Sequence, residues 1–276
     1  MKPASFDYLR PDTPEEAVAA LAEFGGDARI LAGGQSLMAM LNMRLARPKL
    51  LVDIGRLARL SEIRVEKGAL VVGASVTQAA LELRPTLRDE APLLALTLPW
   101  VGHYQTRNRG TVCGSIAHAD PSAELPLCLL ALGGEVVLRS RRGRRTIAAG
   151  DFLLGMLSTA RRDDEMIEAV RFPLRREGSG TAFREVAQRH GDFALVACAA
   201  LASKDGIRFA VGGVSSRPMA CEWPDGLGGA TLDDALNDFA WELGAVDDAH
   251  ASARYRRELV RRMGRAVIEE AQQCRH

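Results

Sequence analysis

The sequence predicts an α+β fold, and three features of its pattern carry that prediction. The first part of the chain alternates helix and strand, with a glycine-rich turn inside the series. From about Ile63 the apolar runs are short and broken by glycine and charge, which is typical of antiparallel pairing and not of a regular βαβ repeat. The last third holds three more apolar runs and then a mainly helical end.

The first expected helix begins after Thr13. Thr13 suits the N-cap, Pro14 suits the first helical position, and two glutamates follow where the helix dipole favours negative charge. Apolar residues then recur at helical spacing until a glycine pair, Gly25 and Gly26, ends the helix. The rest of this unit is, in order, a strand at 29–32, a glycine turn at 33–36, a helix at 37–45 and a buried strand at 50–54.

The middle of the chain is expected to combine short strands and helices. The strands are expected at 63–65, 69–73 and 135–138, and the helices at 77–83 and 92–100. A polar, glycine-containing link at 175–180 follows a further strand at 168–172 and predicts a domain boundary. Beyond it, three antiparallel strands are expected at 183–186, 194–202 and 207–214, with a hairpin turn at 204–206.

Composition excludes several classes of protein. The chain has 276 residues, 47% of them hydrophobic, which is ample for a buried core. Lys+Arg 36 against Asp+Glu 35 provides no overall attraction to nucleic acid or to an anionic membrane. Neither a transmembrane stretch nor a secretory signal is visible. The five scattered cysteines lack metal-site spacing, so we expect reduced thiols, a cytoplasmic location and no metal site or iron–sulfur cluster in this chain.

Two turns are candidates for a ligand site. Gly33 and Gly34 follow a strand and precede Ser36, and glycines there let a ligand approach backbone N–H groups that can hold a phosphate. Gly110 and Gly114, with Thr111 and Ser115, would form a second cradle, and two cradles suit a ligand with two phosphates. Taken alone, however, the first motif favours a plain turn with Ser36 as N-cap, and the two turns could be unrelated. The first motif matches neither the G-x-G-x-x-G dinucleotide pattern nor the G-x-x-x-x-G-K-(S/T) phosphate loop.

Two other features have competing interpretations. Cys113 and His118 could form a nucleophilic pair oriented by an acid, Asp120 or Glu124, but the surrounding sequence favours a buried loop cysteine. Phe193 could cover a flat ring, although its position before an apolar strand favours the first core residue of that strand. No residue is predicted to act as a catalytic acid, base or nucleophile.

Several motifs, taken together, make the chain similar to a known protein family, although no single motif is specific enough to do so. The chain resembles the FAD-binding medium subunit of the molybdenum hydroxylases, the xanthine dehydrogenase and aerobic CO dehydrogenase type. The motifs that match in order and spacing are 32–37 (AGGQSL), 107–114 (RNRGTVCG), 117–121 (AHADP) with 124–126 (ELP), 189–194 (RHGDFA) and 251–256 (ASARYR).

The resemblance implies a fold and a cofactor. Residues 1–176 would form an FAD-binding domain of the vanillyl-alcohol-oxidase (PCMH) type, with an α/β subdomain at about 1–55 and a second at 56–176. Residues 177–276 would form a smaller domain, like the C-terminal one of CO dehydrogenase flavoproteins, with a three-stranded antiparallel sheet and helices. The implied FAD contacts are Leu31, Ala32, Gly33, Gly34, Gln35, Ser36, Leu37, Gly110, Thr111, Cys113, Gly114, Ser115, Ala117, Glu124, Ile167 and Phe193, the last over the isoalloxazine.

The resemblance also implies partners and one anomaly. A small [2Fe-2S] subunit and a large molybdopterin subunit would complete a dimer of heterotrimers, in which electrons pass through FAD to an external acceptor. The family usually has glycine where Cys113 stands. If that position needs a positive φ, or bare backbone against the pyrophosphate, a Cβ there costs about 1 kcal/mol or more and weakens FAD binding. A flavin-free scaffold subunit and a free-standing flavin oxidase of the same fold remain as alternatives.

Overall fold

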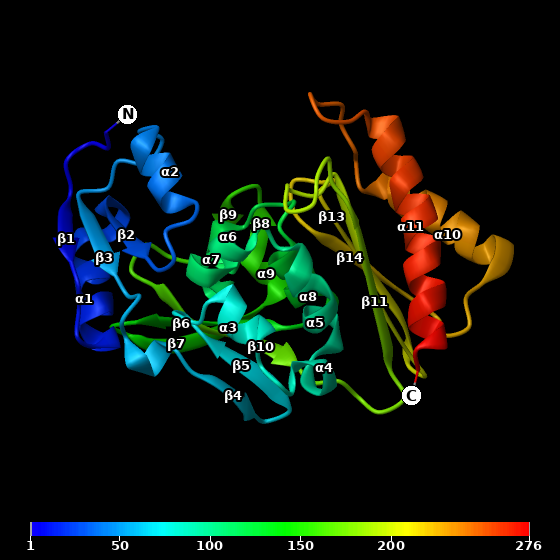
Figure 1. The fold of residues 1–276 in the computed structure, drawn as a ribbon, viewed down its shortest axis with the longest axis horizontal. Helices are drawn as coiled ribbons and strands as arrows, with labels where there is room; N and C mark the ends of the chain where they lie inside the picture. The colour runs from blue at the N-terminus through cyan, green and yellow to red at the C-terminus, as the bar shows by residue number, and fades with distance from the viewer. Residues whose placement is uncertain (1, 276) are drawn as a thin grey trace.

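A computed structural model describes residues 2–275 as three units in a row (Figure 1). The first unit is a parallel sheet in the order β1-β3-β2, with two helices. The elements are β1 (Asp7–Leu9), α1 (Pro14–Phe24), β2 (Ala28–Leu31), α2 (Leu37–Asn42) and β3 (Leu50–Asp53). The Thr13 hydroxyl accepts from the Glu16 N–H at 3.2 Å, so the predicted N-cap is confirmed. The α/β character of this unit is confirmed as well, and β1 adds a strand that the pattern does not predict.

The second unit is a five-stranded sheet in the order β4-β5-β10-β6-β7, and all its pairs are antiparallel. The strands are β4 (Ile63–Glu66), β5 (Ala69–Gly73), β6 (Glu135–Ser140), β7 (Gly143–Ala148) and β10 (Met166–Pro173). A small hairpin, β8 (Leu153–Gly155) with β9 (Ser158–Thr159), lies beside it. The antiparallel pairing expected from the short apolar runs is therefore confirmed.

Helices surround the second sheet, and more of them form than the pattern predicts. They are α3 (Gln78–Glu82), α4 (Leu87–Glu90), α5 (Pro92–Thr97), α6 (Tyr104–Arg109), α7 (Val112–His118), α8 (Glu124–Ala131) and α9 (Ala149–Phe152). The second glycine turn is thus mostly the short helix α7. Every residue of α8 is buried, so this helix shows no amphipathic period by which the sequence pattern could reveal it.

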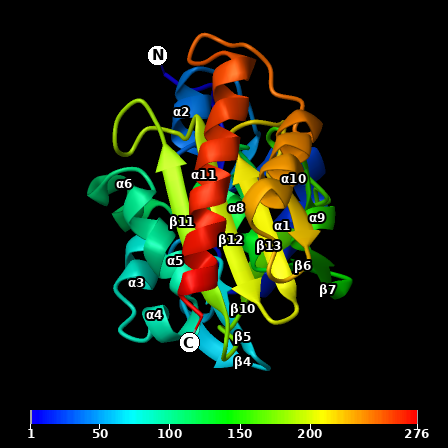
Figure 2. The same cartoon turned by 90° about the vertical axis from the view of Figure 1, so that its right-hand side faces the viewer.

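The third unit is a four-stranded antiparallel sheet in the order β11-β12-β13-β14. It consists of β11 (Gly180–Val186), β12 (Val196–Ser203), β13 (Gly206–Gly212) and β14 (Met219–Trp223). The three predicted strands form, but the sheet has a fourth strand, β14, that the sequence pattern does not predict. The residues of β14 are mostly half-buried and show no clear alternation of buried and exposed positions. Two helices, α10 (Gly229–Glu242) and α11 (Ala253–Gln273), lie across one face of this sheet (Figure 2).

The third sheet is covered on both faces. Phe209 and Cys198 point toward α10 and α11 and share a core with them. Phe183 and Ala199 point the other way and belong to the large core that includes α5 and α8. The predicted boundary at 176/177 falls in the connection between β10 and β11, yet apolar packing crosses it, so the division into domains stays a prediction. Among residues 2–275, no helix is both long and apolar enough to cross a membrane.

Candidate ligand site between two loops

The two glycine-containing turns lie against each other. A Cβ added at Gly33 would lie 2.8 Å from the Arg109 carbonyl carbon and 2.8 Å from the Gly110 Cα, and closer still to the Arg109 carbonyl oxygen. Only a residue without a side chain permits this approach of two backbones. The alternative in which the two turns are unrelated is therefore wrong in one respect, because the two turns are in direct contact.

The first turn is shaped for close backbone contact. Gly34 has φ 72, a left-handed conformation that favours glycine. Its carbonyl accepts from the Met38 N–H at 3.0 Å, which joins the turn to α2. Ser36 stands at the N-cap position of α2, but its side chain makes no capping hydrogen bond. Because Ser36 does not cap the helix, the plain N-cap interpretation does not account for this serine.

The second turn is held from α3 and from its own threonine. The Gly110 carbonyl accepts from the Gln78 N–H at 2.8 Å, and the Val112 N–H donates to the Val76 carbonyl at 3.1 Å. Thr111 is buried, and its hydroxyl accepts from the Gly114 N–H at 3.0 Å as the N-cap of α7. The Thr111 hydroxyl thus shapes the turn from within, whereas Ser115 is only half-buried.

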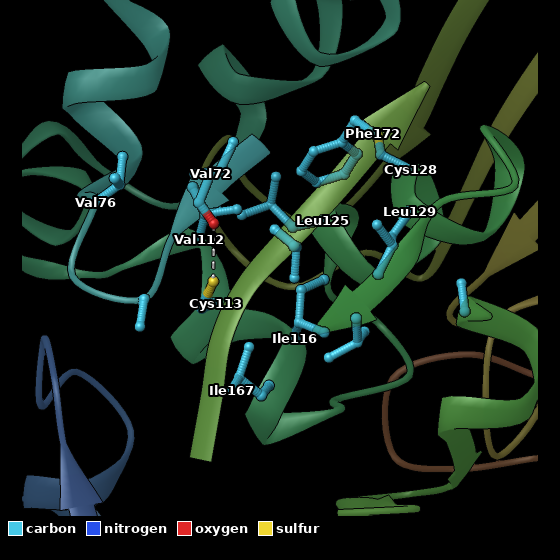
Figure 3. Packing of buried hydrophobic residues seen from close by; sticks show 14 of the residues in the cluster. Val72, Val76, Val112, Cys113, Ile116, Leu125, Cys128, Leu129, Ile167 and Phe172 are labelled. Atoms are coloured by element: carbon cyan, nitrogen blue, oxygen red, sulfur yellow. Dashed lines mark hydrogen bonds between the residues drawn. The ribbon is translucent and has the colours of Figure 1, made fainter. Parts of the chain in front are cut away.

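Cys113 faces the core and not the loop contact. It lies in the first turn of α7, where the backbone is helical, so the condition for strain at this position is not met. Its thiol donates to the Val72 carbonyl at 3.5 Å and lies near Val112 and Ile116 (Figure 3). Burial raises the pKa of this thiol far above its ordinary value, which keeps it protonated. The nucleophile interpretation is therefore wrong, and a buried cysteine, favoured by the pattern, is confirmed.

The remaining predicted contacts lie on several elements. Leu31 ends β2 and Leu37 begins α2, next to the first turn, while Ala117 is exposed on α7. Ile167 is buried on β10, in the same hydrophobic cluster as Ile116 (Figure 3).

Glu124 begins α8 and is a buried acid. Burial, with the nearby charge of Asp120 as a smaller cause, raises the pKa of its carboxyl to about 7. Glu185 on β11 is buried too, and both of its carboxyl oxygens lack a hydrogen-bond partner. Burial and the charge of Glu124 raise the pKa of Glu185 to about 8. Each of these two buried carboxyls therefore has a pKa near or above neutral pH, which the sequence pattern does not reveal.

Phe193 is on the surface. It lies in the loop between β11 and β12 with 61% of its surface exposed, and β12 begins only at Val196. The interpretation of Phe193 as a core residue of that strand is therefore wrong. An exposed aromatic ring on a loop is what a flat ligand could stack on, and this loop contacts Gly102 and His103 on the segment that leads to Arg109 and Gly110. Three further residues beside the site escape sequence reasoning: Arg109, whose carbonyl meets Gly33, and Trp100 and His103, which contact the Phe193 loop.

The geometry fits a phosphate-bearing cofactor. Successive backbone N–H groups in a glycine-containing loop can surround phosphate oxygens. In the second turn the N–H groups of Gly110, Val112, Gly114 and Ser115 already donate within the protein, so the first turn offers the backbone donors. Gly33 and Gly34 are both positions that a Cβ would disturb, the first by contact and the second by φ. The arrangement is thus suited to binding through the backbone, with serine hydroxyls beside it.

Comparisons with known proteins agree with this geometry. The family model described as the FAD binding domain in molybdopterin dehydrogenase matches residues 4–175. The chain is 37% identical over 283 residues to subunit alpha of the 6-hydroxypseudooxynicotine dehydrogenase complex of Paenarthrobacter nicotinovorans, covering 98% of this chain and 96% of the relative. It is 34% identical over 284 residues to the carbon monoxide dehydrogenase medium chain of Hydrogenophaga pseudoflava, covering 98% of each.

A solved structure agrees over the whole chain. The carbon monoxide dehydrogenase from Hydrogenophaga pseudoflava that lacks the Mo-pyranopterin moiety of its cofactor matches with a TM-score of 0.95 and 30% identity, covering 100% of both chains.

Proposed function

We propose a function from one premise: the chain belongs to the family of FAD-binding domains of molybdopterin dehydrogenases. In this proposal it is the FAD-carrying medium subunit of a heteromeric molybdenum hydroxylase and transfers electrons. The observation that carries the proposal is the contact of Gly33 with Arg109 and Gly110, because it joins two backbone cradles within the matched residues.

The proposed FAD site is made of two loops and a few flanking residues. The loops 32–36 and 110–115 would surround the diphosphate, with backbone N–H donors from 32–36 and hydroxyl donors from Ser36 and Ser115. Thr111 fixes the second loop from within, because its hydroxyl accepts from the Gly114 N–H. The proposed flanking contacts are Leu31, Leu37, Ala117, Glu124 and Ile167, with Phe193 over the isoalloxazine. FAD, when bound, supplies the redox chemistry. The chain's part is to bind it, orient it and leave its reactive edge accessible to a partner.

The proposed partners follow from the names of the relatives. One relative is a subunit of a dehydrogenase complex and another is a medium chain, and each is covered almost completely by this chain. We therefore propose that a small [2Fe-2S] subunit delivers electrons to FAD, and that a large molybdopterin subunit holds the substrate. Two heterotrimers would make the complete complex, in the cytoplasm. Within this chain, we propose an FAD domain at 1–176 and a C-terminal domain at 177–276.

The test is to express the chain with its two partner subunits and to measure FAD per chain and its absorbance. We expect one FAD per chain, and we expect that absorbance to bleach when the substrate of the complex is added without an acceptor. A complex without flavin would refute the proposal and favour the scaffold alternative. Substrate turnover by the chain without partners would favour the free-standing oxidase instead.

A further inference from the structure

The loop that carries Phe193 is folded on itself. We call residues 187–195, between β11 and β12, the aromatic loop. Gly191 has φ 88, and the Asp192 N–H donates to the Arg189 carbonyl at 3.1 Å. The side chains of Arg189 and Asp192 form an ion pair at 3.0 Å. These local bonds give the loop a shape but do not fix its direction relative to the two glycine-containing loops.

Contacts from the second unit fix that direction. The His190 ring lies on the Trp100 ring, with centroids 5.4 Å apart and planes at 32°. The Trp100 ring also lies 6.5 Å from that of Phe183 on β11. At Gly191 the packing is closest, because an added Cβ would lie 2.5 Å from His103 Cε1 and 3.1 Å from the Gly102 carbonyl oxygen.

These contacts all come from one short segment. We call residues 100–110 the connector; it begins at Trp100 and contains α6. The Arg107 guanidinium stiffens it by donating to the Val101 and Gly102 carbonyls at 3.1 and 3.2 Å, and it pairs with Glu82 at 2.8 Å. The Arg107 side chain is only 12% exposed, so these bonds are shielded from water.

The connector ends at the loop contact. Its last residues, Arg109 and Gly110, are those that meet Gly33. One stiffened segment of the chain therefore touches the aromatic loop at its start and the first glycine turn at its end. A displacement at either end is expected to be felt at the other, because the bonds of Arg107 tie Val101 and Gly102, which precede α6, to the last turn of that helix.

We propose that the connector is a positioning element, in which Trp100 and His103 set the place of Phe193 relative to the two glycine-containing loops. The inference rests on the proposed function, because Phe193 gains its role from a flavin bound between those loops. Trp100 and His103 act through Phe193 and do not themselves touch the ligand.

Trp100→Leu in the full-length chain tests this inference, because it removes the stacking on His190 and keeps an apolar side chain. Trp100→Phe is the rescue variant, since it restores an aromatic face. Trp241→Leu is the matched control, because Trp241 is 60% exposed on α10, outside the connector. Phe193→Ala provides the reference for a site without the aromatic ring.

Two readouts separate positioning from general stability. In the FAD-free chain, we expect amide hydrogen exchange at 187–194 to rise at least tenfold in Trp100→Leu and to return toward wild type in Trp100→Phe. In the FAD-bound chain, we expect quenching of flavin fluorescence by iodide to move toward the Phe193→Ala value. Trp241→Leu should match wild type in both measurements.

The outcomes distinguish the inference from the proposed function. A wild-type chain that binds no FAD, alone or with its partners, would overturn the proposed function and the inference with it. A wild-type chain that binds FAD, together with a Trp100→Leu chain equal to wild type in exchange and quenching, would overturn the inference alone. Equal effects of Trp100→Leu and Trp241→Leu would also overturn it, since the effect would then be one of general stability.

Discussion

Replacing Gly33 with alanine tests whether the contact between the two loops is needed for FAD binding. The added Cβ would lie 2.8 Å from two backbone atoms of Arg109 and Gly110, whereas ordinary contacts begin near 3.4 Å. All of these neighbours are backbone and cannot rotate away. The two 2.8 Å contacts alone require a separation of about 0.6 Å, and the Arg109 carbonyl oxygen, which is closer still, requires more.

The free-energy cost of the Gly33→Ala substitution can be bounded. Forcing extra atoms into a well-packed contact costs about 1–3 kcal/mol. Each ~1.4 kcal/mol is a factor of ten in an equilibrium constant, so the affinity for FAD should fall roughly fivefold to a hundredfold if the full cost falls on the binding arrangement. Gly155→Ala is the matched control, because nothing lies within 4 Å of a Cβ there and its φ is not in the positive range.

The assay is calorimetric titration of FAD into the FAD-free chain, with thermal unfolding of each variant alongside. We expect Gly33→Ala to bind more weakly and to unfold at a somewhat lower temperature, and Gly155→Ala to remain close to wild type in both. If Gly33→Ala binds FAD within twofold of wild type, the loop contact is not what forms the site and the reasoning above is refuted.

Three further predictions concern the surroundings of the site. Cys113→Gly should lower the free energy of unfolding by about 1–3 kcal/mol, since it puts glycine in a helix and empties a buried position. It should not tighten FAD binding. Melting curves and FAD titration test both expectations, and a tenfold gain in affinity would contradict the inward orientation of the Cys113 side chain. Burial raises the pKa values of Glu124 and Glu185 to about 7 and 8 from an ordinary 4.5, so the native state holds protons that the unfolded chain releases. The free energy of unfolding should therefore fall as the pH rises from 4.5 through 8. Denaturant titrations at several pH values should show a weaker fall in Glu185→Gln. An unchanged dependence of the unfolding free energy on pH in this variant would contradict the raised pKa of Glu185. Thr111→Val removes the cap of α7 and should cost about 1 kcal/mol, while Thr111→Ser should retain most of it; equal melting temperatures for the two variants would show that the cap contributes nothing.

Local pattern accounts for the elements that carry their own signals. The first helix has a cap, a proline and a stop, and three of the four strands of the third sheet, β11 to β13, are apolar runs separated by turn residues, so these elements are predictable. The short helices α6 and α7 are not, because they depend on contacts with other parts of the chain, such as the bonds of Gly110 and Val112 to the segment around α3. Helix α8 is missed for another reason: a helix buried on all sides has no polar face to mark its period.

By itself, the sequence determined the two glycine-containing motifs, their order and the family to which the chain belongs. Only the tertiary structure decided why Gly33 must be glycine, that Cys113 points into the core, and that Phe193 is exposed on its loop. The physical reason is that these properties depend on neighbours far away in the chain. Gly33 is restricted by a carbonyl of Arg109, and its own φ imposes nothing, so no local propensity could reveal the restriction.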